Sequence, residues 1–455
     1  MASNYFTSSQ PLFQKLKRFR TPIFILLCIF LGGTSQPIHL PKIALYVLSS
    51  LIIGVHIFKF SVFDLFQNAK FLSWLALVFC VYSIIQLIPL PPSLWSALPG
   101  RELYAQSYDL MQIPRPWLPI AMVPEDVLRS LLSILPIIAA FLLITRTADW
   151  DERVFAMWAV PFAAAISLAL GAVQQLTADK GFYIYEITNY GSAVGIFSNI
   201  NHHGTLLAIA SVFAVTLAII SRIRHSDGYS RPSVGFIIGC ALALFFILGL
   251  LFNGSSAGYV LLAIAISMTG LSFLNVTERS SARWAVGLVF VVLAFIILDF
   301  FFLGNAQKNF THSLTDQSAT SRQAIFKISW EILRDVFPWG TGLGSFREIY
   351  PSYEKLHEVT SVYVNHVHND FLELVVEMGI VGAGIIVAFI LWWTRVFIGL
   401  LSTQNPVAQY AKMAAIGLLI IMIHSVVDYP FRTVSISSIA GLCMGLMYIG
   451  QAEMK

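Results

Sequence analysis

Residues 322–377 read RQAIFKISWEILRDVFPWGTGLGSFREIYPSYEKLHEVTSVYVNHVHNDFLELVVE and form the longest polar interval of the chain. The interval contains an amphipathic segment, a run of glycines, several tyrosines and an Asn-His-Val-His-Asn sequence. It leads directly into an apolar stretch that is long enough to be a membrane helix. We therefore expect the rest of the protein to be a membrane frame that holds this interval at one face of the bilayer.

The amino-acid composition argues against an ordinary soluble protein. The 455 residues are 57% hydrophobic and 11% charged, and the mean hydropathy is +0.75, whereas soluble domains carry about 25% charged residues. The net charge of +4 is small and scattered, so it does not suggest binding to nucleic acid. All four cysteines lie in apolar runs, which indicates neither a disulfide framework nor a cysteine metal site. The composition predicts an all-α polytopic membrane protein.

Twelve apolar runs have about the length, roughly 20 residues, that an α-helix needs to cross a bilayer. They lie near residues 21–39, 41–59, 71–90, 127–145, 154–176, 202–221, 233–252, 256–274, 284–303, 371–394, 411–427 and 433–450. Three of the connections between them are long, namely 91–126, 178–201 and 304–370. The fold prediction is therefore about twelve transmembrane helices, with a large loop between the ninth and the tenth.

The distribution of basic residues predicts how these helices are oriented. If the N-terminus lies in the cytoplasm, every short connection on that side carries Lys or Arg, and the three long connections lie outside. This pattern follows the positive-inside rule and predicts that both termini are cytoplasmic. The chain then divides into a cytoplasmic segment (1–20), helices 1–9 (21–303), the large outer loop (304–370) and helices 10–12 (371–450).

The large outer loop is expected to contain an amphipathic helix. Thr320 to Gln323 fit a capping box with Thr320 as the N-cap, and Pro338 is expected to end the helix. Two apolar rows at helical spacing indicate that this helix lies in the membrane interface or packs on the bundle. Arg322 falls in its first turn, where the helix dipole disfavours a cation. We therefore expect Arg322 to have an anionic partner, either protein or ligand.

A glycine-rich turn follows this helix at residues 339–346. Alternating glycines are typical of a tight turn, and such a turn can also expose N–H groups to phosphate oxygens. Arg347 comes next, and a guanidinium can donate two parallel hydrogen bonds to a phosphate. Tyr350 lies three residues further on and could stack on a sugar ring. These residues predict binding of a phosphorylated or sugar-bearing ligand.

The histidines at the end of the interval are candidate proton acceptors. His366 and His368 titrate near neutral pH and precede the tenth helix. A metal site is not expected, because it would need three or four ligands in a plausible geometry. The spacing of Asp370 and Glu373 can cap the helix. Glu377 lies one turn deeper, where a carboxylate is unfavourable without a partner, so we expect a cation or donor from a neighbouring helix.

Two further groups of polar residues lie at helix ends on the same side. Asn199, Asn201, His202 and His203 stand at the start of the sixth helix and could cap it or face a substrate. His424 and Asp428 share a helix face, and Asp428 with Arg432 could form an ion pair that closes the bundle. His424 and Arg432 could also reach a substrate. Both interpretations stay open for each group.

The loop of residues 91–126 is rich in proline and is expected to resist regular structure. Its two tryptophans, Trp95 and Trp117, are suited to the membrane interface. The loop is expected to be an interfacial lid or a packing segment.

Several motifs in the second half of the chain resemble the O-antigen ligase/O-antigen polymerase superfamily. They are Ser-Arg322 before a Trp-containing helix, Pro338 to Phe346, His368-Asn369 running into Leu372, Glu377, Gly379 and Gly382, and Phe197 to His202 at a helix start. Each motif is weak alone, but their order, their spacing and the large loop before the third-last helix are typical of the group. The similarity covers residues 190–432, whereas the first half matches only as membrane helices.

The resemblance implies a metal-independent and cofactor-independent GT-C glycosyltransferase in the bacterial inner membrane, with its active site facing the periplasm. The donor would be a glycan on undecaprenyl pyrophosphate. The acceptor would be a lipid A–core sugar in a ligase, or the end of another lipid-linked repeat in a polymerase. By resemblance, Arg322 binds the pyrophosphate, and His368 is the general base or orients the acceptor hydroxyl. Relatives often carry a second arginine in the loop that here spans residues 178–201, where the only basic residue is Lys180.

The predicted site therefore combines two catalytic residues, Arg322 and His368, with a set of substrate-binding residues. That set is Arg347, Asn199, Asn201, His202, His366, Asn369, Glu377, Tyr350, His424 and Arg432. Arg347 or Arg432 could replace the missing arginine, and either His366 or His368 could be the base. Besides a ligase or a polymerase, a protein O-oligosaccharyltransferase and a polysaccharide or lipid transporter are the alternatives. The transporter is disfavoured because transporters hold their polar chemistry at mid-membrane.

Overall fold

The computed structural model describes residues 18–36, 39–60, 69–147, 149–177, 179–224, 233–274, 317–355, 359, 363–403 and 408–453. Within these ranges the regular structure is helical, and the one extended pairing is an isolated antiparallel bridge between Leu90 and Leu118. In chain order the helices are α2 (Arg20–Leu31), α3 (Leu40–Lys59), α5 (Lys70–Ile85), α6 (Pro92–Trp95), α7 (Glu102–Leu110), α8 (Pro124–Ser133), α9 (Leu135–Thr145), α10 (Trp150–Thr177), η1 (Lys180–Phe182), α11 (Ile200–Arg224), α12 (Val234–Asn253), α13 (Ser256–Leu274), α16 (Gln317–Val336), α17 (Phe346–Ile349), η3 (Tyr350–Ser352), α18 (Asp370–Ser402), α19 (Gln409–His424), η5 (Pro430–Arg432) and α20 (Val434–Ala452).

The helices agree with the predicted membrane character of the chain. Seven helical segments in the described ranges are long and apolar enough to cross a membrane, and four shorter apolar helices accompany them. Each predicted span corresponds to one of these segments except 284–303, which lies outside the described residues. The total of twelve spans stays a prediction.

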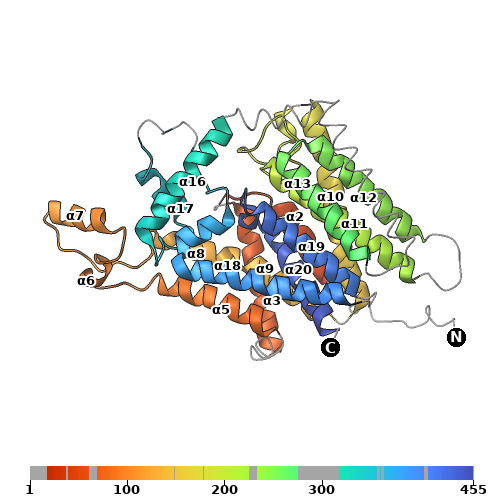
Figure 1. Cartoon of the computed structure of the whole chain (residues 1–455), viewed down its shortest axis with the longest axis horizontal. Helices are drawn as coiled ribbons and strands as arrows, with labels where there is room; N and C mark the ends of the chain where they lie inside the picture. The colour runs from red at the N-terminus through yellow and green to blue at the C-terminus, as the bar shows by residue number, and fades with distance from the viewer. Residues whose placement is uncertain are drawn as a thin grey trace.

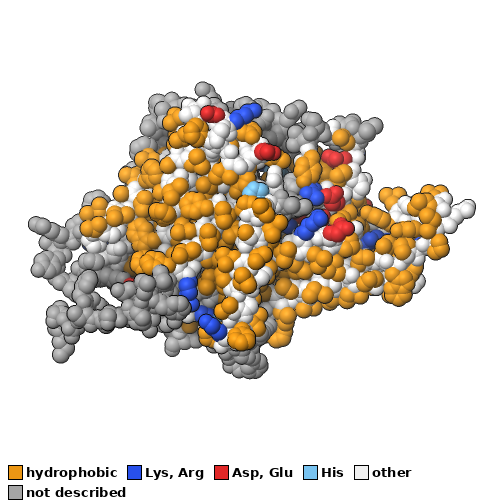
Figure 2. Space-filling view, turned by 180° about the vertical axis from the view of Figure 1, so that it is seen from behind, with side chains coloured by type: hydrophobic (Ala, Val, Ile, Leu, Met, Phe, Trp, Pro, Cys, Tyr) orange, Lys and Arg blue, Asp and Glu red, His pale blue; other side chains and the backbone are white. Residues whose placement is uncertain are grey.

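The helices form a bundle around one large apolar core (Figure 1). α10 to α13 lie together at one end of the molecule, and α16 and α17 lie at the other, next to the projecting α6–α7 segment. α19 and α20 are buried in the middle, where α20 packs against α9 and α19 packs against α11. Seen from behind, most of the described surface is hydrophobic, and charged side chains gather between the main body and the projection (Figure 2).

Residues 91–126 are more regular than the sequence suggested. They form α6 and α7 and the first turn of α8, because Pro92 and Pro124 occupy first-turn positions, where a missing N–H is harmless. Trp117 is 64% exposed, but Trp95 is fully buried, and its indole N–H donates to the carbonyl of Pro116 at 2.8 Å. The prediction of an irregular loop with two interfacial tryptophans was therefore wrong for Trp95.

The amphipathic helix of the large loop is α16, and it ends before Pro338 as expected. It begins at Gln317, so Thr320 lies inside it and is not its N-cap. Arg322 consequently lies beyond the first turn, where the helix dipole is weaker. The predicted apolar row is buried against α18 and the segment that follows the glycine turn; its members are Ile325, Ile328, Ile332 and Val336. Trp330 and Phe337 of the second row are about half exposed.

A kink in α18 fixes the position of the glycine-rich turn. Gly379 has φ 58° and ψ −138° inside the helix, which leaves helical carbonyls without their usual partners. The turn supplies these partners: Thr341 N donates to Val376 O at 3.0 Å, and Gly342 N donates to Glu377 O at 2.9 Å. Gln86 of the segment after α5 also donates from Nε2 to Glu377 O at 2.9 Å. These hydrogen bonds join the glycine-rich turn, the kink and the end of α5.

Candidate functional site

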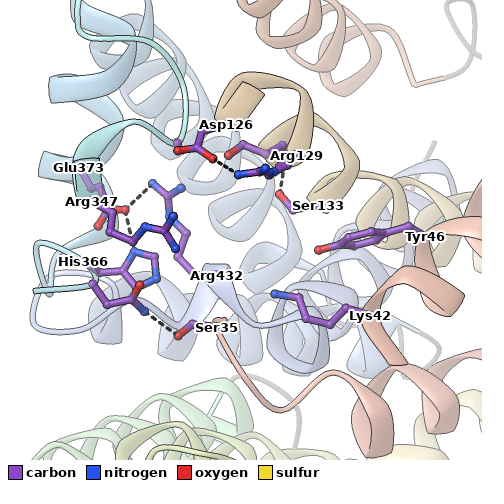
Figure 3. Close-up of a pocket in the computed structure, with 13 residues that line it drawn as sticks. Ser35, Lys42, Tyr46, Asp126, Arg129, Ser133, Arg347, His366, Glu373 and Arg432 are labelled. Carbon is purple, nitrogen blue, oxygen red and sulfur yellow. Dashed lines mark hydrogen bonds and ion pairs between the residues drawn. The ribbon is translucent and has the colours of Figure 1, made fainter. Parts of the chain in front are cut away.

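A polar pocket opens where α3 and the segment before it meet α8, the glycine-rich turn with α17, the loop and first turn of α18, and η5 (Figure 3). Its walls are formed by Ser35, Lys42, Tyr46, Asp126, Arg129, Ser130, Ser133, Gly344, Arg347, Asn365, His366, Glu373 and Arg432. Four of these residues are Lys or Arg and two are Asp or Glu. The lining therefore has an excess of positive charge, which is suited to an anionic ligand.

One wall of the pocket carries a histidine–carboxylate pair. His366 Nδ1 lies 2.8 Å from Glu373 Oε1, and a carboxylate only accepts hydrogen bonds. Nδ1 therefore carries the proton and donates it, which leaves a lone pair on Nε2. His366 Nε2 is buried and has no hydrogen-bond partner within the described part of the chain. Burial lowers the pKa of His366 despite the opposing effect of Glu373, so the ring is neutral at pH 7. The lone pair of this nitrogen is not used by any hydrogen bond within the described ranges.

Arg432 holds three acidic side chains of α18 together. Its guanidinium lies 3.1 Å from Glu373 Oε1, 3.1 Å from Glu377 Oε2 and 3.7 Å from Asp370 Oδ1. Burial alone would lower the pKa of Arg432, but Glu373, Glu377 and Asp370 raise it further than burial lowers it. The expectation that Glu377 needs a cationic partner is confirmed. The expected pair of Asp428 with Arg432 was wrong, because Arg432 is drawn to the three carboxylates of α18 instead.

Asp428 lies in a second buried polar cluster beside the pocket. His368 Nδ1 is 3.4 Å from Asp428 Oδ1, and His202 and His424 each bring a nitrogen to 3.7 Å from the same carboxylate. Asn201 Nδ2 donates to Asp428 Oδ2 at 2.7 Å. Burial would raise the pKa of Asp428, but the surrounding histidines hold it well below its ordinary value. Asp428 is therefore an anion that organises residues from α11, α19 and the loop before α18.

The two clusters meet at Tyr429. Its ring centroid lies 4.4 Å from that of His366, 4.9 Å from that of His368 and 5.1 Å from that of His202. Burial and the neighbouring Asp428 raise the pKa of Tyr429, so its hydroxyl stays protonated. His368 adopts φ 57°, a left-handed conformation that a side chain disfavours. This backbone bend turns His368 toward Asp428, while His366 lines the pocket.

Residues 240–387 match the sequence profile of a family described as O-antigen ligase. This matched range, called the O-antigen ligase domain below, supports the resemblance to the O-antigen ligase/polymerase superfamily. The matched range contains the glycine-rich turn, the histidines and the kink of α18. The search of curated proteins returned no match.

The O-antigen ligase domain contributes only part of the pocket. Gly344, Arg347, Asn365, His366 and Glu373 come from the matched range, whereas the other eight lining residues lie outside it. The helices around the domain therefore complete the pocket. Among the described residues, no group of three or more His, Cys, Asp or Glu side chains is arranged to hold a metal ion.

The structure distributes the predicted site residues over three environments. Arg347, His366 and Arg432 line the pocket. Asn201, His202, His368 and His424 surround Asp428. Glu377 is buried behind the pocket with Arg432. Sequence reasoning placed all of these near one site without separating the two clusters.

The remaining predicted residues have visible structural roles. Asn369 is the N-cap of α18, because its Oδ1 accepts from Leu372 N at 2.9 Å; the expected cap by Asp370 was wrong. Asn199 Oδ1 accepts from Asn201 N at 2.8 Å at the start of α11. Tyr350 is buried against Phe346 in the core under α16. Arg322 does not line the pocket and makes no ion pair with any residue in the described ranges.

Sequence reasoning missed the wall formed by α3 and α8. Lys42 and Tyr46 come from a helix that was expected to be only a membrane span. Asp126 comes from the end of the loop that was predicted to be a lid or a packing segment, and Arg129 comes from the start of the next predicted span. Spacing gives one weak signal, since Lys42 and Tyr46 are four residues apart and share a helix face. The glycine-rich turn, in contrast, is a tight turn whose N–H groups bond within the fold, for example Leu343 N to Gln86 Oε1 at 3.1 Å.

Proposed function

We propose that this protein transfers a glycan from a polyprenyl diphosphate to the hydroxyl of an acceptor sugar, as an O-antigen ligase-type enzyme of surface polysaccharide assembly. The observation that supports this most strongly is the pocket itself. It brings a neutral histidine with an available lone pair together with several cations, and five of its residues belong to an O-antigen ligase domain. A base and a set of cations are the two elements that displacement of a diphosphate by a hydroxyl requires.

In this proposal His366 is the base. As the acceptor oxygen bonds to the anomeric carbon, His366 Nε2 takes the hydroxyl proton, and Glu373 stabilises the resulting imidazolium through Nδ1. The bond from the anomeric carbon to the diphosphate oxygen breaks at the same time, and the diphosphate leaves with the electron pair. The geometry favours His366 over His368, because His366 lines the pocket and His368 contacts Asp428.

The departing diphosphate gains negative charge, so cations must stabilise it. Arg129 and Arg347 line the pocket and can donate from their guanidinium groups to phosphate oxygens. Each also has a carboxylate neighbour: Arg129 Nη1 lies 2.9 Å from Asp126 Oδ1, and Arg347 Nη2 lies 2.6 Å from Glu348 Oε1. These pairs hold the guanidinium groups in position before the donor binds. The role of Arg322 in pyrophosphate binding stays a prediction.

The cellular setting belongs to the same proposal. The basic short connections in the sequence support an inner-membrane protein with cytoplasmic termini and with its pocket facing the periplasm. The donor would then be an undecaprenyl-pyrophosphate-linked glycan, and the acceptor a lipid A–core sugar. A polymerase that joins lipid-linked repeats would use the same pocket, since the motifs of the two enzymes are shared.

The mechanism is tested by His366→Gln and His368→Gln in cells that lack the chromosomal copy. We expect His366→Gln to abolish glycan transfer while the protein remains inserted and abundant, with Arg395→Gln, distant from the pocket on α18, as a control. Normal glycan attachment and chain length in His366→Gln would contradict the assignment of the base. Deletion of the gene separates the two activities: long lipid-linked chains accumulate when a ligase is lost, whereas single repeats accumulate when a polymerase is lost.

A further inference from the structure

We propose that Lys42 and Tyr46 on α3 form a diphosphate-binding subsite on the wall of the pocket opposite His366. This inference rests on the proposed function for the identity of the ligand, a polyprenyl diphosphate, but its physical basis is independent of that function. It assigns a ligand to a part of the pocket that lies outside the O-antigen ligase domain.

The first observation is that Lys42 is a buried cation with no carboxylate partner among the described residues. The residue is only 3% exposed. Its ammonium group has three donors, and the one hydrogen bond it makes within the described ranges goes to the carbonyl of Gln36 at 2.8 Å. Burial of a charged group without a counterion is strongly unfavourable. A ligand anion would remove this penalty.

The second observation is the contrast with the other cations of the pocket. Arg432 contacts three carboxylates, Arg129 contacts Asp126, and Arg347 contacts Glu348. Their charges are largely balanced within the protein. Lys42 is therefore the cation of this pocket whose charge is least compensated, and it is the natural anchor for an anionic group.

The third observation is the direction of the side chains. Figure 3 shows Lys42 and Tyr46 pointing from α3 into the pocket, toward His366 and Arg432. Ser133 and Arg129 of α8 face the same space. An ammonium, a phenol and a serine hydroxyl are donors that match the oxygens of a diphosphate.

The position of Lys42 at the first turn of an apolar helix favours a lipid-linked diphosphate over a nucleotide. α3 is long and apolar enough to cross a membrane. Its outer face carries exposed apolar side chains, Ile43 and Val47, directly beside the subsite, and Val47 is 55% exposed. A polyprenyl chain attached to the diphosphate can run along this face, whereas a nucleoside has no apolar chain to place on it.

The test is a binding titration of the full-length protein in lipid nanodiscs, with EDTA present and with farnesyl diphosphate as the probe. Lys42→Gln should weaken binding by about tenfold to a hundredfold, as expected for the loss of a hydrogen bond to a charged group. Lys42→Arg should keep most of the affinity because it keeps the charge. Lys59→Gln, which removes the same charge from the exposed opposite end of α3, should leave binding unchanged.

Two further measurements make the outcome decisive. Unfolding of the empty protein should be no easier for Lys42→Met than for wild type, because the variant removes an unpaired buried charge; a purely structural lysine would give a loss of stability. Uridine diphosphate should bind much more weakly than farnesyl diphosphate. Unchanged farnesyl diphosphate binding in Lys42→Gln, no binding to wild type, or equal Lys42-dependent binding of uridine diphosphate would each overturn the proposal. Lys42-dependent binding without any glycan transfer would instead refute the proposed function and leave this inference standing.

Discussion

The kink at Gly379 gives the sharpest test of how the fold builds the site. Gly379 has φ 58° and ψ −138°, and a Cβ at this position would lie 1.9 Å from the carbonyl oxygen of Pro338. The neighbouring Gly340 is also constrained, since its Cβ would lie 2.5 Å from the carbonyl oxygen of Glu377. The turn and the kink therefore approach each other through two glycines, and Gly379→Ala must push them apart.

The magnitude follows from two contributions. A residue other than glycine in such a backbone conformation costs about 1–3 kcal/mol. Forcing an extra methyl group into a packed contact costs about another 1–3 kcal/mol. Gly379→Ala should therefore lower the free energy of unfolding by about 2–6 kcal/mol. Gly384→Ala is the matched control on the same helix, because no atom lies within 4 Å of its Cβ. It should stabilise the protein by about 0.5–1 kcal/mol through helix propensity.

The assay is a titration of both variants with SDS in detergent micelles, followed by tryptophan fluorescence. Separation of the turn from the kink also moves Glu377, which is held by Arg432, so glycan transfer should fall in Gly379→Ala and not in Gly384→Ala. Equal stability of the two variants would refute the account of the turn as a partner of the kink.

Two further predictions concern charge. Arg432→Gln leaves three buried carboxylates without their shared cation and should lower the free energy of unfolding by about 3–5 kcal/mol. Arg347→Gln removes a partly exposed ion pair and should lower it by about 1 kcal/mol or less. Similar losses of unfolding free energy for the two variants in an SDS titration would contradict the role given to Arg432. Burial lowers the pKa of His366 below the ordinary value of about 6.5, so the unfolded chain takes up the proton first as the pH falls. The stability contributed by neutral His366 is thus complete above about pH 6.5 and is lost as the pH falls through the pKa of the folded state. His366→Gln should therefore reduce the pH dependence of the unfolding free energy in SDS titrations between pH 5 and 8. An unchanged pH dependence in this variant would refute the argument.

The features that depend on neighbouring residues were predictable from the sequence. Apolar runs of membrane length gave the helices, because crossing a bilayer requires a continuous apolar segment. The periodicity of Ile325 to Val336 gave the buried face of α16, and Pro338 gave its end. The need of Glu377 for a cation also followed from its position inside an apolar helix. All of these follow from interactions along one segment.

The partners across the fold were not predictable in the same way. The start of α16 was placed four residues late, because the sequence at Thr320 fits a capping motif although the helix already begins upstream of it at Gln317. The start of α8 was not predicted, because it lies in a proline-rich segment that was expected to be irregular. Lys42 was not predicted as a pocket residue, because it lies in a helix that was expected only to span the membrane. Hydrophobic patterns show which side of a helix is buried, but they do not show which other helix it meets.

The apolar runs of the sequence thus determined the membrane class of the protein, and the polar interval of residues 322–377 indicated the kind of chemistry, because its polar residue types stand out within an apolar chain. Tertiary structure alone decided the pairing of these residues. Gln86 bonds to the carbonyl of Glu377 across 291 residues, and Asn201 bonds to Asp428 across 227 residues. Such contacts arise from the packing of distant helices, so their geometry is fixed only when the whole bundle closes. The pocket is a product of that closure, since Lys42, Arg129, His366 and Arg432 come together from four separate parts of the chain.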